Sequence, residues 1–315
     1  MGLGSQEVAV VSSVLAEVVE RFRTVQSQAF HDEASVYAHE LPRALRQGIN
    51  HFRLHEPSAL LLVSGYPVAD QGIGRTPAHW RPGSSENPAA REEFFLFLCA
   101  SLLGDPVAWA DKHDGRIVTN IVPVRGDEDE QLASSSSTPL TWHTEDAFHP
   151  LRADYLGLMC LRNHDQAATT VASVDDVQLP DDVAEILAQP RFVILPDGSR
   201  SGAATEDHPI PLLFGSTHTP YLRLDQHYTR PAAADDAEAA SALGVAMSAV
   251  SDALTGHALG AGDVLFVDNY RAVHGRESFK ARYDGTDRWL KRVNVVRDLR
   301  RSRAVRGVAH SRTIG

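Results

Sequence analysis

The chain of 315 residues contains only 2 cysteines, and none of its apolar runs approaches the ~20 residues that a membrane-spanning helix needs. Cys99 and Cys160 lie in apolar stretches, so we expect two buried thiols and not a disulfide framework. The N-terminal segment has no basic stretch followed by an apolar signal core. These features predict a cytoplasmic protein that has no membrane partner.

Positive charge is also scarce. Lys and Arg number 30 against 41 Asp and Glu, which gives a formal net charge of −11 at pH 7. General nucleic-acid binding needs a positive surface, so a nucleic-acid partner is not expected. A hydrophobic content of 43% and a charged content of 23% are typical of a globular protein, and they are compatible with a small-molecule ligand.

Helical patterns dominate the first third of the sequence. The predicted helices cover residues 6–29, 34–47 (with a break at Pro42) and 92–104. A short apolar run over 58–68 predicts a buried strand, and the Gly- and Pro-rich residues 69–92 predict a loop.

Short strands are expected in the remainder of the chain. The candidates are residues 115–124, 155–163, 191–196, 219–225, 263–269 and 289–296, with an Ala-rich helix over 235–256. The acidic and serine-rich segment 126–139 predicts a mobile loop, and the basic tail 299–315 is expected to be poorly ordered. This order of elements predicts an α+β protein with a jelly-roll barrel and a helical insertion. We expect one domain over 1–315, with a helical part at 1–55 and a core at 56–298.

A histidine and a glutamate stand two residues apart in the segment TWHTED, residues 141–146. In an extended segment His143 and Glu145 point to the same face, so both can bind one metal ion. His274, in the segment DNYRAVHGR after a predicted strand, is the best candidate for a third ligand. Two imidazoles and one carboxylate leave coordination positions open, which suits iron(II) oxygen chemistry, whereas four protein ligands suit structural zinc.

Arg288 distinguishes between the metals. The chain has 15 histidines, so a His-x-Glu pair arises readily by chance, and zinc bound by two His and one Glu is chemically reasonable. Arg288 follows His274 and begins the predicted strand 289–296, where it can form a bidentate ion pair with a carboxylate near the metal. Its structural alternative is a surface ion pair with Asp284 or Asp287.

These motifs resemble a known enzyme family. The segments WHTEDAFHP and GDVLFVDNYRAVHGR, together with Arg288, resemble the clavaminate synthase-like branch of the iron(II)/2-oxoglutarate dioxygenases, within the taurine dioxygenase superfamily. The likeness extends from about residue 55 to 298, and the branch includes the arginine and asparagine β-hydroxylases of peptide-antibiotic biosynthesis. Glu145 fits this branch because most of the superfamily has Asp at that place.

The resemblance implies a distorted jelly roll (double-stranded β-helix) with flanking helices. It also implies iron(II) as the metal, with 2-oxoglutarate and O₂ as cosubstrates. The iron ligands that it implies are His143, Glu145 and His274. Arg288 matches the arginine that binds the far carboxylate of 2-oxoglutarate, and Thr170 matches the hydroxyl beside it, with Thr169 as the neighbouring alternative.

The substrate implied by the resemblance is an amino acid, either free or tethered to a carrier protein. Arg292 matches the arginine that binds the substrate carboxylate, and Glu145 also approaches the substrate amino group in the family. Arginine hydroxylases of the branch bind guanidinium with two acidic residues; Asp225 fills the first place, but His227 occupies the second. Arginine, lysine, a cyclic arginine derivative and a shorter amino acid therefore stay open. His113 is expected to line the pocket.

Five functions are compared. An amino-acid hydroxylase is favoured, and an oxidase of the same fold that desaturates or cyclises its substrate would share all of these ligands. A halogenase is disfavoured because it needs the carboxylate ligand to be absent. A non-catalytic barrel that binds a small acid predicts a missing ligand, and a zinc hydrolase would not need Arg288.

Overall fold

The computed structural model describes residues 1–81, 87–196, 205–206 and 208–315, so part of the predicted loop 69–92 lies outside the described residues. The α-helices are α1 (Ser5–Phe22), α2 (Gln28–Ala38), α3 (Arg43–His55), α4 (Ala90–Ser101), α5 (Asp181–Leu187) and α6 (Ala237–Asp252). The 3₁₀ helices are η1 (His113–Gly115), η2 (Val174–Asp176) and η3 (Leu299–Val305).

Two main sheets hold most of the strands. The larger sheet has the order β1-β12-β5-β14-β2-β15, with β3 also paired to β14. Its strands are β1 (Leu60–Val63), β2 (Asp105–Trp109), β3 (Val118–Ile121), β5 (Tyr155–Arg162), β12 (Val264–Asp268), β14 (Trp289–Val296) and β15 (Thr313–Ile314). The smaller sheet has the order β11-β6-β13-β4. Its strands are β4 (Leu140–His143), β6 (Thr169–Ser173), β11 (Thr255–His257) and β13 (Ala272–Arg276).

A shared apolar interior joins the two sheets. Leu158, Leu265 and Leu290 of the larger sheet belong to one buried cluster with Val171 and Ala272 of the smaller sheet. The two sheets therefore face each other, because these side chains can pack together only between them. The mixture of helices and largely antiparallel sheets confirms the predicted α+β class.

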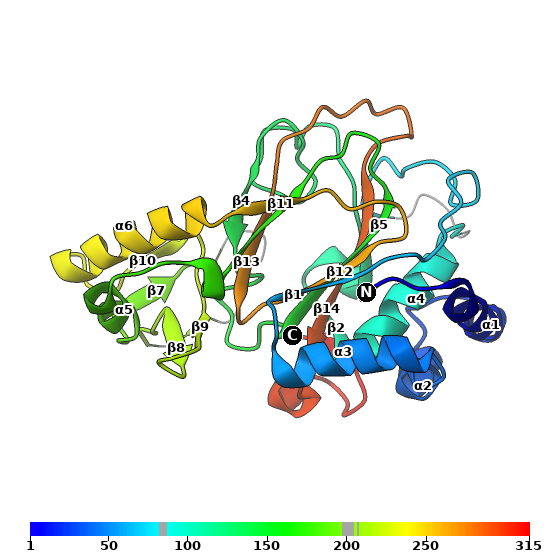
Figure 1. Cartoon of the computed structure of the whole chain (residues 1–315), viewed down its shortest axis with the longest axis horizontal. Helices are drawn as coiled ribbons and strands as arrows, with labels where there is room; N and C mark the ends of the chain where they lie inside the picture. The colour runs from blue at the N-terminus through cyan, green and yellow to red at the C-terminus, as the bar shows by residue number, and fades with distance from the viewer. Residues whose placement is uncertain (82–86, 197–204, 207) are drawn as a thin grey trace.

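Helices α1 to α4 cover the outer face of the larger sheet (Figure 1). Phe94, Phe95 and Phe97 of α4 are fully buried in the cluster that joins these helices to β14 and β5. The predicted helix 6–29 was too long, because Arg23 takes a left-handed conformation (φ 62°) and ends α1 there. The predicted break at Pro42 is confirmed, since Pro42 directly precedes α3.

The insertion forms a lobe beside the smaller sheet (Figure 1). It contains α5, α6 and two small sheets that pair β10 with β7 and β8 with β9. These strands are β7 (Phe192–Ile194), β8 (Leu213–Gly215), β9 (Pro220–Leu222) and β10 (Thr229–Pro231). The helix predicted over 235–256 is confirmed by α6. Sequence patterns missed α5, which is only 7 residues long and too short to show a clear period.

The basic tail is well integrated, and the prediction of poor order was wrong. Strand β15 pairs in parallel with β2. The Arg312 guanidinium forms an ion pair with Asp105 at 2.7 Å, and Arg306 donates hydrogen bonds to several backbone carbonyls, including that of Ser311 at 2.7 Å. Composition suggested solvated charges, but these arginines find acceptors within the fold.

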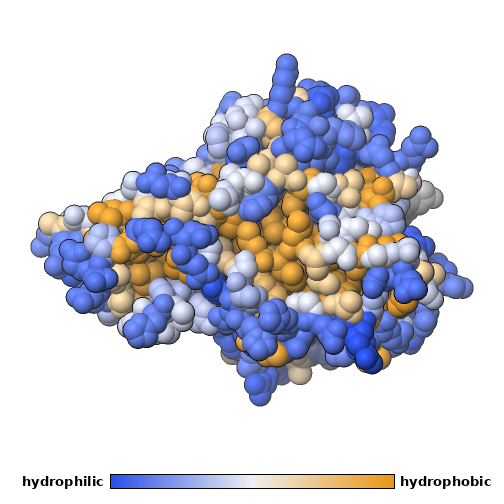
Figure 2. Space-filling view, in the orientation of Figure 1, coloured by the Kyte–Doolittle hydropathy of each residue, from blue (hydrophilic) through white to orange (hydrophobic). Residues whose placement is uncertain are grey.

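Most of the visible surface is hydrophilic around an apolar middle. Figure 2 shows apolar residues gathered across the centre of one face, in the region of β1, with hydrophilic residues above and below it. Leu62 of β1 is 41% exposed on the surface. In the described ranges, no helix combines the length and apolar character needed to cross a membrane.

A buried ion pair joins α4 to β14, and its contribution to stability can be tested. Lys291 Nζ lies 2.7 Å from Glu93 Oε1 and 2.6 Å from Asn120 Oδ1, and both charged side chains are almost fully buried. Removing one partner of a buried pair costs about 3–5 kcal/mol because the other charge is left unpaired. We expect Glu93→Leu to lower the free energy of unfolding by about 3 kcal/mol in urea titrations.

The matched control is the double variant Glu93→Leu with Lys291→Met. We expect it to regain most of the lost stability, because no unpaired charge remains in the interior. Equal losses in the single and double variants would show that packing, and not charge, is what this pair contributes.

Candidate metal centre

Two histidines far apart in the sequence lie opposite each other on β4 and β13. His143 pairs with His274 in the antiparallel register, and their ring centroids are 4.6 Å apart. The register shifts between His274 and Arg276, and such a bulge re-aims the side chains next to it. Gly275 permits this close approach, because a Cβ at that position would lie only 2.5 Å from the Leu140 carbonyl oxygen.

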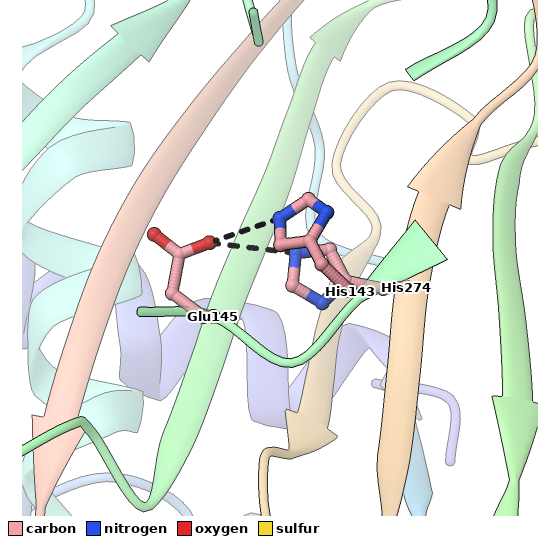
Figure 3. Close-up of side chains that lie close together, drawn as sticks. All are labelled: His143, Glu145 and His274. Atoms are coloured by element: carbon pink, nitrogen blue, oxygen red, sulfur yellow. Dashed lines mark ion pairs between the residues drawn. The ribbon is translucent and has the colours of Figure 1, made fainter. Parts of the chain in front are cut away.

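Glu145 reaches the two histidines from the turn that follows β4. Figure 3 shows its carboxylate facing both rings; Oε2 lies 3.7 Å from His143 Nε2 and 3.5 Å from His274 Nε2. The expected extended geometry for this residue was wrong, since β4 ends at His143 and Asp146 has a φ of 50°. Strand alternation therefore does not place Glu145 beside the histidines.

Asn269 holds the Glu145 backbone in place. Its Oδ1 accepts from Glu145 N at 2.8 Å, and its Nδ2 donates to Glu145 O at 3.0 Å and Ala153 O at 2.9 Å. The Asn269 side chain is fully buried, just before β13. Nothing in the sequence pattern identified Asn269, because its partners are backbone atoms of a distant segment.

The three side chains present their ligand atoms to one point. One ligand atom from each of His143, Glu145 and His274 lies within 4.8 Å of the others. His143 Nδ1 is hydrogen-bonded to the Thr141 carbonyl at 2.9 Å, which orients its Nε2 toward the site. Two imidazoles and one carboxylate from one side fit a divalent metal ion and leave further positions open.

Electrostatics keep the glutamate ionised. Burial raises the pKa of Glu145, but the nearby charges of Arg292 and Lys112 and the two histidines bring it well below its usual value. Burial lowers the pKa of His143, but Glu145, the Thr141 carbonyl and Asp225 together raise it, so the net shift is upward. Burial lowers the pKa of His274. A metal ion requires a charged carboxylate and neutral imidazoles, and the lowered pKa values of Glu145 and His274 favour that state.

A cavity of about 370 Å³ opens beside these side chains. The predicted binding residues that line it are His113, Asp225, His227, Arg288 and Arg292. The cavity also contacts the segment 131–134 of the Ser-rich loop. It is large enough for a small organic molecule together with a second one at the metal.

Arg288 lies at a buried end of the cavity beside a threonine. Its Nη2 donates to Thr169 Oγ1 at 3.2 Å, and its Nε has no hydrogen-bond partner among the described residues. The prediction for Thr170 requires correction, because Thr169 lines the cavity and Thr170 does not. Successive side chains of β6 point to opposite faces, so a shift of one position reverses the direction.

Arg276 is a second buried arginine at this end, and the sequence analysis missed it. Its Nη2 donates to Ser135 Oγ at 2.7 Å and Thr138 O at 3.1 Å. Burial lowers the pKa of both Arg276 and Arg288 to about 10, and the neighbouring charge of Arg288 adds to the shift of Arg276. Arg276 could have been found from the sequence, because it stands two residues after His274 and so on the same face of the strand.

Asp225 and His227 also line the cavity, next to His143. Asp225 forms an antiparallel bridge with His143, and its Oδ1 accepts from His227 N at 2.8 Å and Tyr228 N at 2.9 Å. One oxygen of Asp225 therefore stabilises a turn, while Oδ2 has no such contact with the turn. His227 is exposed at the rim.

His113 lies on the wall near Arg292. Its backbone is in the left-handed region (φ 51°), and its ring packs edge-on against Trp80 at 4.8 Å between centroids. Burial, with the charges of Arg292 and Lys112, lowers the pKa of His113 to about 3. The ring is therefore neutral at physiological pH.

The Ser-rich loop, expected to be mobile, is held by hydrogen bonds along the cavity. Ser136 N and Ser137 N donate to Glu128 O at 3.2 and 3.0 Å, and Ser135 and Ser136 are buried. The loop covers the site next to Arg276. The mobility expected from its composition stays a prediction.

Comparison with known proteins identifies similar chains. A family model described as "Taurine catabolism dioxygenase TauD, TfdA family" matches residues 87–294. An enduracididine beta-hydroxylase of Streptomyces hygroscopicus is 42% identical over 337 residues, which cover 99% of this chain and 98% of the relative. An L-ornithine/L-arginine 3-hydroxylase of Catenulispora acidiphila is 37% identical over 345 residues and covers 100% and 99%.

Solved structures of the non-heme iron oxygenase OrfP are similar over the whole chain. OrfP with Fe and alpha-ketoglutaric acid has a TM-score of 0.94 at 39% identity, covering 100% of this chain and 99% of OrfP. OrfP with Fe, succinate and (3S)-hydroxy-L-Arg has a TM-score of 0.93 at 38% identity, with the same coverage.

The geometry predicts that metal binding depends on His143. We expect His143→Ala to weaken iron(II) binding at least about 100-fold, since even residues behind the ligands typically contribute 10–100-fold. Anaerobic equilibrium dialysis of iron(II) measures this directly. His257→Ala is the matched control, because His257 lies on β11, outside the cavity, and iron(II) affinity should not change. Equal affinities of wild type and His143→Ala would contradict the assignment.

Proposed function

The chain belongs to the TauD/TfdA family of dioxygenases, and we propose that it hydroxylates an unactivated C–H bond of a free L-amino acid with a guanidine-bearing side chain. It is an iron(II)- and 2-oxoglutarate-dependent enzyme, as the similar OrfP structures indicate. When bound, iron(II), 2-oxoglutarate and O₂ supply the oxidation, in which 2-oxoglutarate becomes succinate and CO₂. The protein contributes binding, orientation and the exclusion of water.

His143, Glu145 and His274 are the proposed iron ligands. Three donors that approach from one side suit an iron(II) oxygenase, because the cosubstrate and O₂ need the remaining positions. The Asn269 clamp on Glu145 and the Thr141 carbonyl on His143 fix the directions of these ligands.

The buried arginines carry the proposal for the cosubstrate. Among the described residues, neither Arg288 nor Arg276 forms an ion pair with a carboxylate, although both are more than nine-tenths buried. A buried guanidinium without a counter-ion is costly, and a dicarboxylate that reaches Arg288 from the metal would neutralise it. We assign Arg288 to the far carboxylate of 2-oxoglutarate and transfer the hydroxyl role from Thr170 to Thr169.

The α-carbon end of the substrate is assigned to the part of the wall formed by Arg292 and Glu145. Arg292 Nη1 lies 3.1 Å from Glu145 Oε1, so a cation and an anion stand side by side near the metal. A zwitterionic amino acid matches this pair, with its carboxylate toward Arg292 and its amino group toward Glu145. His113, neutral and beside Arg292, completes this wall.

The side-chain end is assigned to Asp225. With Oδ1 committed to the turn, Asp225 offers Oδ2 to a cationic group, so it accepts from guanidinium through one oxygen. His227 stands where a second carboxylate would complete a two-acid clamp. The relatives named for enduracididine, ornithine and arginine support a basic substrate, and a cyclic guanidine needs fewer hydrogen bonds than arginine.

Several broader assignments follow from the family. The facing sheets are proposed to form the distorted jelly roll, and the whole chain to act as one catalytic domain, which the 98–100% coverage of the relatives supports. A role in natural-product biosynthesis, as in antibiotic pathways, fits a relative that hydroxylates enduracididine. The cytoplasmic location stays a prediction.

The substrate is tested with the iron(II)-loaded enzyme and a panel of L-amino acids. We expect 2-oxoglutarate-dependent hydroxylation of enduracididine or arginine, detected by mass as one added oxygen, and little product from asparagine. Lysine and ornithine test whether a simple amine suffices. Hydroxylation of asparagine alone would contradict the proposal that the substrate carries a guanidine group, and it would leave the roles of iron and 2-oxoglutarate intact.

Asp225→Asn is the companion variant for that panel. Loss of a charged hydrogen bond of about 1.5–3 kcal/mol predicts a 10- to 100-fold lower kcat/KM for the guanidine substrate. Iron(II) affinity should stay the same, because Asp225 is not a ligand. An unchanged kcat/KM would move the cation site away from Asp225.

Arg288→Met tests the cosubstrate site. Because Arg288 would donate charged hydrogen bonds in a buried place, we expect the KM for 2-oxoglutarate to rise about 100-fold. Succinate formation at varied 2-oxoglutarate measures this change. Arg282→Met is the matched control: Arg282 is exposed, pairs with Asp165, and should leave this KM unaltered. A parallel rise in both variants would point to a general disturbance of the segment before β14.

A further inference from the structure

Lys112 is a cation on the cavity wall that no function above uses. It directly precedes η1 and lines the cavity, and 17% of its side chain is exposed. Its Nζ lies 3.5 Å from Asp146 Oδ1 and 3.9 Å from Glu145 Oε1. Both separations are longer than the 2.7–2.9 Å typical of charge-assisted hydrogen bonds. The donors of Lys112 are therefore not fully used by these two carboxylates.

Asp146 alone does not account for Lys112. The other Asp146 oxygen, Oδ2, already accepts from Trp109 Nε1 at 2.7 Å, which orients the carboxylate from behind. Lys112 meets only Oδ1. A cation placed solely to neutralise a buried carboxylate would be expected to donate to it at a short distance.

Lys112 and Arg292 lie near the same oxygen of Glu145. Arg292 Nη1 is 3.1 Å and Lys112 Nζ is 3.9 Å from Glu145 Oε1, so the two nitrogens are at most 7.0 Å apart. A carboxylate that accepts at about 2.8 Å on each oxygen can join two cations at this separation. The single negative charge of Glu145 is shared between both cations and the metal site.

We infer that Lys112 and Arg292 together bind the α-carboxylate of the substrate, which makes Lys112 a specificity-determining residue for free amino acids. The inference rests on the proposed function and extends it. A thioester-tethered or esterified amino acid presents a neutral carbonyl and would leave the Lys112 ammonium without its anion. The site therefore selects the free acid over a carrier-bound substrate.

Steady-state kinetics test this selection with the amino acid that the enzyme accepts as substrate and with the methyl ester of that amino acid. In Lys112→Met we expect the KM of the free acid to rise about 10- to 100-fold with little change in kcat, because ground state and transition state lose the same contact. Lys112→Arg should restore most of the affinity. The ester should be a poor substrate of the wild type, and Lys112→Met should not worsen it.

Lysine footprinting gives a readout that does not depend on activity. The chain has three lysines; Lys280 is exposed, and Lys291 is buried against Glu93. Under anaerobic conditions, with iron(II) and 2-oxoglutarate present, we expect the free acid to slow reductive methylation of Lys112 at least several-fold. Methylation of Lys280 should be unaffected, and the methyl ester should protect Lys112 weakly.

Two results would overturn the inference. One is equal methylation of Lys112 with and without the free acid, and the other is an unchanged KM in Lys112→Met with lowered thermal stability, which would leave only an ion pair with Asp146. If the wild type turns over the free acid in the same assay while either result is seen, the inference about Lys112 fails but the proposed function stands. Lys280→Met, an exposed position, controls for loss of one lysine.

Discussion

The antiparallel register of β13 determines what this site contains. His274 faces His143 on β4 and Val171 on β6, and Arg276 faces Thr169. A slip by one residue would turn Val273 and Gly275 toward the cavity and the histidine and arginine away from it, because side chains alternate along a strand. The backbone hydrogen bonds of one short strand thus hold a metal ligand and a buried cation on the same face. The sheet supplies this rigidity before any ligand binds.

The side chains of β14 also alternate between two faces, and the two faces have different roles. Leu290 points into the interior shared by the sheets, on the side of Arg288 and Arg292. The alternate residues Trp289, Lys291 and Val293 face the helical layer, where Lys291 pairs with Glu93 of α4. The helices therefore bury and position the back of the strand whose front binds ligands. Burying the charges of Arg288 and Arg292 on this face is unfavourable, and anionic ligands offset that free-energy cost when they bind.

The chemistry of the site was more predictable from the sequence than its geometry. Metal ligands and carboxylate-binding arginines are restricted to a few residue types at characteristic spacings, so His143, Glu145, His274 and Arg288 stood out, and the structure brings them together. Thr170 was predicted one position away from Thr169 because strand phase cannot be read from two adjacent threonines. Asn269 and the order of the basic tail depend on partners distant in the sequence, for which a single sequence carries no signal.

The lining of the cavity is built by different parts of the chain, and this division has a consequence for specificity. His143, His274 and Arg292 lie on the two main sheets and Arg288 directly precedes β14, whereas Asp225 and His227 lie inside the insertion, between β9 and β10. That segment is nevertheless tied to the metal site, because Thr144 N donates to Leu224 O at 2.8 Å and His143 bridges to Asp225. On the proposed function, these backbone contacts set the span between the iron and the cation-binding carboxylate. Changes such as a histidine at 227 can therefore alter which side chain is accepted, while the carbon placed nearest the iron is governed by that fixed span.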